Sequence, residues 1–254
     1  MKIDDITLTM FSWDDIPETR YGQHTGAFSG NSQLGLVTIR TDDGIEGHAF
    51  LGSASRGANL DAESLVQHLK PQLMGKDPLE RESLYQAMYS RLRMTTHRAI
   101  GAMDSALWDI AGKTANLPIR KLIGGSRHSI PAYASSPAMT EAAEYVEQAL
   151  SFQEAGWAAY KIHPPAVWRT DIKICEAVRD AVGDDAALGI PILATEYSPG
   201  GFAGYAPWIM NQATDYLRGD VAVKGGITGC LKAAHLAEGF AMNFEIHHGG
   251  NSLN

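Results

Sequence analysis

The stretch from Asp215 to Asn254 constrains the fold more than any other part of the chain, because it predicts a complete βαβ unit. Residues 217–223 and 243–248 have the composition of short strands, and a helical pattern separates them. Strands joined through a helix lie parallel, so both end at the same edge of their sheet. We therefore expect Asp220 and His247 to meet at that edge, although they lie far apart in the sequence.

A carboxylate beside an imidazole is the simplest pair of side chains that can act as a general acid or base near neutral pH. The carboxylate fixes the imidazole tautomer and raises its basicity. The competing interpretation is a solvated Asp220 and a His247 near a Gly-rich loop, with no contact between them. A pattern of two residues does not decide between these interpretations, so the rest of the chain has to be weighed.

The composition is that of a soluble α/β protein and argues against several kinds of partner. The 254 residues are 44% hydrophobic, which is enough for one large domain or two smaller ones. The 21 Lys and Arg residues against 29 Asp and Glu residues give a net charge of −8, and there is no basic run. Nucleic acid is therefore not an expected partner. An anionic substrate stays possible, because local cations or a metal ion can dominate a pocket.

The two cysteines and the N-terminal residues bear on the compartment. Cys175 and Cys230 form no CxxC pair, which fits a reducing cytosol. The N-terminal MKIDDITLTMF places charges where a signal peptide needs an apolar run, and no window approaches the length of a membrane span. The sequence therefore predicts a cytoplasmic protein that does not involve a membrane.

Residues 1–50 predict antiparallel strands, with a DG turn in TDDGIEGHAF between two of them. Residues 13–31, between the first two strands, are polar, aromatic and Gly-rich and predict a long loop, and a second loop covers 52–59. The long loop is either a lid that excludes water or a plain surface loop. The side chains that would suit a lid are Trp13, Tyr21, His24 and Phe28.

The pattern turns helical from Asp61 onward. The first helix is expected to begin with Asp61 as its cap and to stop near Pro71. A later helix, in HRAIGAMDSALWDIAGK, is expected to be buried, because apolar residues recur along one face of it. These residues are Ile100, Met103, Leu107 and Ile110.

After Gly125 strands alternate with helices, which predicts a parallel sheet, either a barrel or an open one. The expected strands before the βαβ unit are 129–135, 158–164 and 190–196, and Thr140 is expected to cap the first helix between them. In both kinds of sheet, active groups gather at the C-terminal ends of the strands. The reactive side chains at these ends are Lys161, His163, Glu196, Asp220 and His247.

Three passages resemble the enolase superfamily in its mandelate racemase and muconate lactonizing enzyme branch. They are TDDGIEGHAF, GAMDSALWDIAGKTANLPIRKLIGG and the later series KxH, ATE, RGDVAVKGGITG and HHGGN. The resemblance implies an α/β fold in which an α+β capping domain, residues 1–125, covers a modified TIM-type barrel, residues 126–254. The loops 13–31 and 52–57 resemble the specificity loops of the capping domain.

The resemblance also implies a metal and a chemistry. In that family Mg²⁺ holds the carboxylate of a small-molecule substrate while a base removes the proton α to that carboxylate, and charge stabilisation by the dication is the largest expected effect. Glu196 matches the metal-binding carboxylate of the fifth barrel strand. Asp220 and His247 match the catalytic Asp–His dyad of the sixth and seventh strands, with His248 as the alternative histidine.

The second barrel strand departs from the family pattern. Lys161 matches the first Lys of the family's catalytic KxK pair, and His163 falls where the second Lys would be. Because of this departure, the identity of the base contributed by the second strand stays open. Either His163 is the base, or it binds substrate while Lys161 assists.

The predicted barrel is incomplete. Residues 126–254 amount to roughly half of a full eight-stranded barrel and resemble its first, second, fifth, sixth and seventh strands. The third and fourth strands, which would bring two further carboxylates to the metal, are absent between Asp185 and Ile190, and the eighth is missing. An open remnant would expose unpaired edges and apolar surface, so we expect these residues to be part of a longer chain rather than a true deletion product.

The leading functional hypothesis is Mg²⁺-dependent dehydration of a sugar acid or a related hydroxy acid. One alternative is a racemase or epimerase of a 2-hydroxy or amino acid. An alternative of another class is a non-catalytic relative that binds a carboxylate. Relatives of this kind are commonly homo-oligomers, so a homo-oligomer is implied as well.

Overall fold

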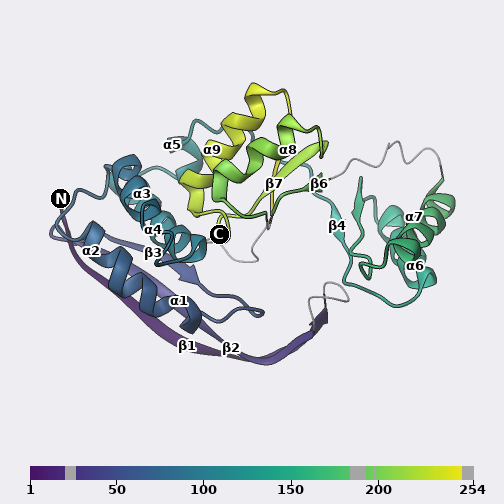
Figure 1. Cartoon of the computed structure of the whole chain (residues 1–254), viewed down its shortest axis with the longest axis horizontal. Coiled ribbons are helices and arrows are strands. Elements are labelled where there is room, and N and C mark those ends of the chain that lie inside the picture. The colour runs from purple at the N-terminus through teal and green to yellow at the C-terminus, as the bar shows by residue number, and fades with distance from the viewer. Residues whose placement is uncertain (21–26, 184–192, 197, 248–254) are drawn as a thin grey trace. The chain divides into compact units, whose positions relative to one another are not determined.

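The computed structural model describes residues 1–20, 27–183, 193–196 and 198–247 (Figure 1). The chain divides into two compact units. The first comprises residues 1–13, 32–125 and 190–254, and the second comprises residues 14–31 and 126–189. The boundary predicted at Gly125 thus coincides with one end of a unit, while the division into a capping domain and a barrel stays a prediction.

The N-terminal strands form an antiparallel sheet, as predicted. The order is β1 (Ile3–Arg20), β2 (Ala27–Thr41) and β3 (Glu46–Leu51). Strand β2 pairs with β3 from Gly35 opposite Leu51 to Arg40 opposite Glu46, and the predicted DG turn joins them. Its Gly44 has φ +87°, a left-handed conformation that glycine adopts without strain.

The prediction of a long loop over residues 13–31 is wrong for the described part of that range. Strand β1 continues to Arg20 and β2 begins at Ala27, so Trp13 and Phe28 lie in strands. Adjacent strands satisfy each other's backbone N–H and C=O groups, and this pairing overrides a local composition that favours loops. Tyr21 and His24 lie outside the described residues.

Helices follow the sheet at the predicted places, but the first one does not begin where the sequence predicts. Asp61 is not its cap; this buried carboxylate lies inside the helix and accepts hydrogen bonds from Arg56 and Thr96. The predicted stop near Pro71 is confirmed, because α2 ends at Leu73, shortly after the proline, and a π-helical turn precedes it. The elements are α1 (Asn59–Ser64), η1 (Leu65–Leu69), α2 (Lys70–Leu73), α3 (Arg81–Tyr89), α4 (His97–Ala115) and α5 (Ile119–Leu122).

Helix α4 is the core of the first unit. Its N-terminus is capped by Thr96, whose hydroxyl accepts a hydrogen bond from the Ala99 N–H. The predicted apolar stripe is confirmed, since all four of its side chains are fully buried, among the largest cluster of apolar residues. Gly47 of β3 lies so close to the Ala106 carbonyl that a side chain there would collide with the helix backbone.

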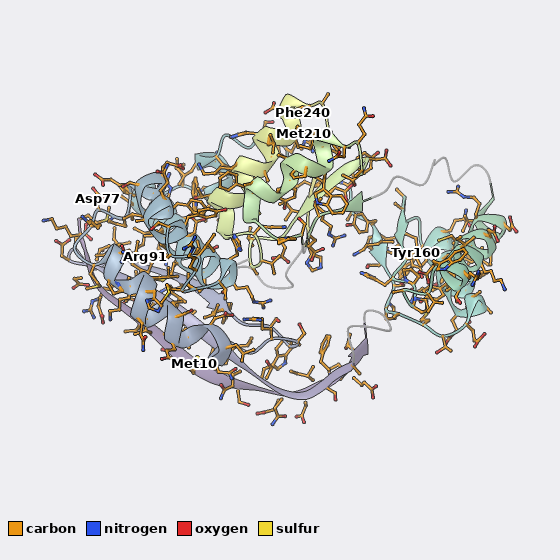
Figure 2. All side chains as sticks on the ribbon, in the orientation of Figure 1. Met10, Asp77, Arg91, Tyr160, Met210 and Phe240 are labelled. Carbon is orange, nitrogen blue, oxygen red and sulfur yellow. The ribbon has the colours of Figure 1, made fainter. Side chains whose placement is uncertain are left out.

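The second unit contains a short parallel pair, β4 (Ala134–Ser135) and β5 (Tyr160–Lys161), with α6 (Ala142–Glu154) and α7 (Trp168–Val182). Tyr145 and Ile174 are fully buried where the two helices pack, and Tyr160 packs against them (Figure 2). Thr140 does not cap α6. Glu141 does, in a capping box with Glu144, because a Glu three residues after the cap can reach back to its N–H.

The predicted C-terminal βαβ unit is confirmed. Strands β6 (Leu193–Ala194), β7 (Tyr216–Gly219) and β8 (Phe244–Ile246) form a parallel sheet in that order, and α9 (Gly226–Gly239) connects the last two. A 3-10 turn, η2 (Gly201–Tyr205), and α8 (Ala206–Met210) follow β6. Residues 185–190, where two barrel strands are predicted to be absent, lie outside the described part of the chain.

The strand predicted over residues 217–223 is too long. Strand β7 ends at Gly219, and the N–H groups of Val223 and Lys224 both donate to the Asp220 carbonyl in a turn. Asp220, Ala222 and Lys224 therefore lie beyond the strand, in a turn, and do not share a strand face. The following GG pair sets this turn, because Gly225 and Gly226 have φ of +84° and +89°.

None of the helices that the structure describes combines the length and apolar character that a membrane span requires.

Helix α4 also holds the start of α9 through a buried aspartate. Asp104 Oδ2 accepts a hydrogen bond of 2.8 Å from the Thr228 N–H, and Trp108 Nε1 donates to the Thr228 hydroxyl at 3.0 Å. Burial of the Asp104 carboxyl raises its pKa to about 7, although the Thr228 hydrogen bonds and the Arg81 charge oppose the shift. Protonation of Asp104 is therefore linked to folding.

We expect Asp104→Asn to remove a pH dependence of stability. Since the folded-state pKa lies above the unfolded value of 3.8, the stabilising contribution is complete below about pH 4 and is lost as pH rises through about 7. Urea denaturation at pH 5 and pH 8 measures this pH dependence. Between these two values the free energy of unfolding of the wild type should fall by on the order of 2 kcal/mol more than that of the neutral Asn variant. Parallel losses in the two proteins would contradict this linkage.

Candidate functional site

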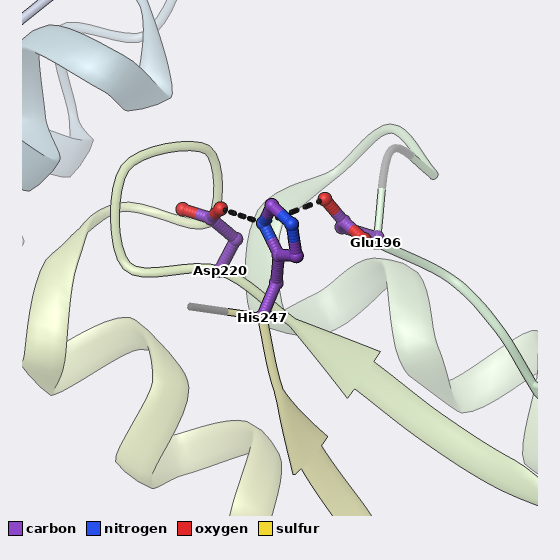
Figure 3. Close-up of side chains that lie close together, drawn as sticks. All are labelled: Glu196, Asp220 and His247. Atoms are coloured by element: carbon purple, nitrogen blue, oxygen red, sulfur yellow. Dashed lines mark hydrogen bonds and ion pairs between the residues drawn. The ribbon is translucent and has the colours of Figure 1, made fainter. Parts of the chain in front are cut away.

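Three side chains converge at the C-terminal ends of β6, β7 and β8 (Figure 3). Asp220 directly follows β7, and His247 directly follows β8. The His247 N–H donates to the Gly219 carbonyl at 2.8 Å, so the two strand ends stay paired up to the site. Glu196 follows β6, and the ligand atoms of all three side chains lie within 4.8 Å of one another.

Asp220 and His247 form the contact that the βαβ unit predicts. His247 Nδ1 lies 2.7 Å from Asp220 Oδ2, and the Ala222 N–H donates to Asp220 Oδ1 at 2.6 Å. The carboxylate therefore holds the proton on Nδ1, which makes Nε2 the ring nitrogen suited to exchange a proton. Asp220 is buried and His247 is 40% exposed, so the pair has a fixed inner partner and an accessible outer one.

Glu196 lies between the guanidinium of Arg218 and the imidazole of His247. Its Oε2 is 2.6 Å from Arg218 Nε, and its Oε1 is 3.4 Å from His247 Nδ1. The Arg218 and Glu196 side chains are only 5% and 14% exposed, so this ion pair is largely removed from water. Arg218 is a site residue that the sequence reasoning missed. The available signal was a charged residue on the strand that leads into Asp220.

Thr195 joins β6 to β7 at the base of the site. Its hydroxyl accepts from the Arg218 N–H at 3.0 Å and lies 3.1 Å from the Arg218 carbonyl, to which Tyr205 also donates. Thr195 has φ +89°, which a β-branched residue adopts only when its surroundings impose it. The backbone that leads into Glu196 is therefore held in one conformation.

The donor set suits a hard divalent cation. Mg²⁺ is bound through oxygen and usually by one or two carboxylates, with water or substrate completing an octahedron. Glu196 and Asp220 offer such oxygens, and Arg218 Nε lies 2.6 Å from Oε2 of Glu196. Because the Nδ1 atom of His247 is engaged by Asp220, the histidine is better suited to proton transfer than to metal ligation.

Lys161 and His163 belong to the second unit. Lys161 ends β5 opposite Ser135, and His163 follows two residues later. His163 Nδ1 lies 2.7 Å from the Ser136 carbonyl, which can only accept, so this nitrogen carries the proton. The structure thus fixes the His163 ring by hydrogen bonds within this unit. The catalytic roles of both residues stay predictions, and His248 lies outside the described residues.

The fold and the site define a class of protein. Parallel strands that end in carboxylates and in a carboxylate–histidine pair are typical of α/β proteins with an acid–base site at the C-terminal edge of the sheet.

Comparison with known families specifies this class further. A family model described as mandelate racemase / muconate lactonizing enzyme, N-terminal domain, matches residues 18–124. A second, described as enolase C-terminal domain-like, matches residues 185–254. The chain belongs to the enolase superfamily, in its mandelate racemase and muconate lactonizing enzyme branch. The predicted combination of a capping domain with a TIM-type barrel is the fold of this family.

Individual relatives differ in activity. The chain is 39% identical over 140 residues to a D-galactonate dehydratase family member from Paenibacillus sp., covering 52% of this chain and 33% of the relative. It is 29% identical over 164 residues to N-succinyl-L-Arg/Lys racemase from Bacillus cereus, covering 62% and 43%. The crystal structure of D-glucarate dehydratase from Agrobacterium tumefaciens complexed with magnesium superposes with a TM-score of 0.81 at 28% identity, covering 98% and 81%.

The chain thus spans only about a third of the first of these curated relatives.

Proposed function

We propose that this chain takes part in Mg²⁺-dependent abstraction of the proton α to a carboxylate, and that the reaction is dehydration of a sugar acid or a related hydroxy acid. The observation that carries the proposal is the 2.7 Å contact between Asp220 and His247 at parallel strand ends, next to the Glu196 carboxylate. The dehydratases among the relatives support the choice of substrate class.

His247 acts as a general acid or base in this proposal. Asp220 keeps the proton on Nδ1 and stabilises the imidazolium that forms when Nε2 accepts a proton. In a dehydration, the histidine can then return its proton to the hydroxyl group that leaves as water. Lys161 and His163 are retained from the family resemblance as the proposed second set of acid–base groups.

Glu196 is the residue proposed to hold Mg²⁺. When bound, the ion supplies electrostatic stabilisation of the negative charge that develops on the substrate carboxylate. Arg218 Nε lies 2.6 Å from Glu196 Oε2 and so fixes the position of this carboxylate at the end of β6.

The described strands of residues 126–254 can be matched to strands of the family barrel. Strands β4 to β8 would correspond to the first, second, fifth, sixth and seventh strands of the family barrel, with the third, fourth and eighth missing. The grouping of the described strands into one parallel pair and one parallel triplet supports this correspondence. A homo-oligomer and a small-molecule carboxylate substrate are proposed with it.

Racemisation or epimerisation is the second candidate, because one of the relatives is a racemase. The two reactions are separated by their products after incubation with Mg²⁺ and a panel of sugar acids and N-acylated amino acids in D₂O. Dehydration yields a 2-keto acid and water. Racemisation instead yields recovered substrate with deuterium at the α carbon and inverted configuration, and this result would overturn the dehydratase proposal.

A non-catalytic carboxylate-binding protein is the rival from another class. Such a protein would bind the same substrates without converting them. The effect of removing the His247 imidazole distinguishes a binder from an enzyme, because proton transfer requires that group and carboxylate binding does not.

A further inference from the structure

Lys224 is a buried lysine beside the site, and it has a specific set of partners. It lies in the turn after β7 and is 1% exposed. Its ammonium donates to the Ser198 carbonyl at 2.6 Å and to the Ser198 hydroxyl at 3.1 Å, and it lies 4.8 Å from the centre of the Tyr205 ring. Lysine is almost never fully buried unless it is paired. A buried lysine with these specific partners therefore indicates a structural or functional role.

The partner of Lys224 closes the turn that carries Glu196. The Ser198 N–H donates to the Thr195 carbonyl at 3.1 Å, and the Ser198 hydroxyl donates to the same oxygen at 2.8 Å. Glu196 lies between these two residues. The Thr195 end of the turn is tied to β7 by the hydroxyl contacts with Arg218, and the Ser198 end is tied to the next turn by Lys224.

We propose that Lys224 is a positioning residue that holds the Thr195–Ser198 turn, and with it the Glu196 carboxylate, in the geometry that binds the metal. The inference rests on the proposed function insofar as Glu196 is taken to be a metal ligand. The turn needs such support, because Thr195 has an unfavourable positive φ and tends to relax once its contacts are removed. An outer partner that orients a ligand changes metal affinity although it does not touch the metal.

Burial explains why the contacts of Lys224 are strong. Desolvation lowers the pKa of its ammonium to about 8, with the Cys230 and Glu196 charges opposing the shift. At pH 7 the group is therefore still mostly protonated. Hydrogen bonds from a charged donor in a dry environment are stronger than those between neutral groups.

The first test uses metal-free protein and the exchange of the Ser198 amide hydrogen with solvent. Lys224→Met keeps the length and apolar stem of the side chain and removes the donor, so this amide should exchange roughly tenfold faster or more. Lys232→Met is the matched control, because this lysine lies on α9 and pairs with Glu82 at 2.6 Å. Its variant should exchange like wild type at Ser198.

The second test is Mg²⁺ binding to the same proteins by titration calorimetry. Lys224→Met should bind Mg²⁺ roughly tenfold more weakly or worse, while Lys232→Met should match wild type. If Lys224→Met does not fold, Ser198→Ala serves instead: it removes the hydroxyl contacts to Lys224 and Thr195 and should shift both measurements in the same direction by less.

The outcomes separate this inference from the proposed function. Unchanged Ser198 exchange in Lys224→Met, or unchanged Mg²⁺ affinity beside a wild type that binds the ion, would overturn the positioning role even if the melting temperature falls. A wild type that binds no Mg²⁺ would instead contradict the proposed function. In that case the amide exchange alone decides whether Lys224 holds the turn.

Discussion

Replacement of His247 by Asn is expected to lower kcat at least hundredfold, because the variant lacks a group that can exchange a proton at the position of Nε2. The Asn amide can still donate to Asp220, so the local fold and substrate binding should be largely preserved. Steady-state kinetics on the substrate identified from the sugar-acid panel measure kcat and KM separately. A fall in kcat with little change in KM is the expected pattern.

The control for this variant is His235→Asn, the same substitution on an exposed histidine of α9. It should leave both kinetic constants unchanged. If His247→Asn keeps wild-type turnover, His247 is not the acid–base group. If neither wild type nor variant turns over substrate but both bind it with similar affinity, the non-catalytic alternative is supported.

The largest expected effect on stability comes from Arg218→Met. The variant leaves Glu196 as a largely buried carboxylate without its 2.6 Å partner, and breaking a buried ion pair from one side costs about 3–5 kcal/mol. The free energy of unfolding, measured by urea denaturation, should fall by roughly 3 kcal/mol, since Glu196 retains some exposure and a contact with His247.

The double variant Arg218→Met, Glu196→Gln tests the physical cause. Removing the carboxylate charge together with the guanidinium should restore most of the lost stability, because the remaining amide is neutral. A double variant as unstable as Arg218→Met would mean that lost packing of the arginine side chain, and not an unpaired charge, explains the effect.

The meeting of Asp220 and His247 was predictable because it depends only on local order. A strand, a helix and a parallel strand bring their ends to one edge whatever the rest of the fold does, and the structure has β7, α9 and β8 in that arrangement. The buried stripe of α4 was predictable for a similar reason, since the spacing of its apolar residues identifies one helix face.

The ion pair between Arg218 and Glu196 could not be read from the sequence, because it depends on which strand lies next to β7 and in which register. Leu193 pairs with Tyr216 and Ala194 with Leu217, and this register places Glu196 beside Arg218. The end of β7 at Gly219 was missed because the residues after it have strand-like composition, whereas the glycine pair beyond them imposes a turn.

The loop predicted over residues 13–31 failed for a different reason. Its polar and Gly-rich composition describes what the side chains prefer, but strand formation in β1 and β2 depends on backbone pairing between neighbours. Trp13 is 43% exposed although it lies in a strand, so an exposed side chain does not by itself indicate a loop.

The most direct test of the central claim is exchange of the substrate α-proton in D₂O, followed by NMR with wild-type protein and the sugar-acid panel. We predict that at least one acid loses its α-proton signal in the presence of Mg²⁺, and that EDTA or His247→Asn abolishes this loss. Loss of the signal that persists undiminished in EDTA, or no loss with any acid, would contradict metal-dependent proton abstraction by this site.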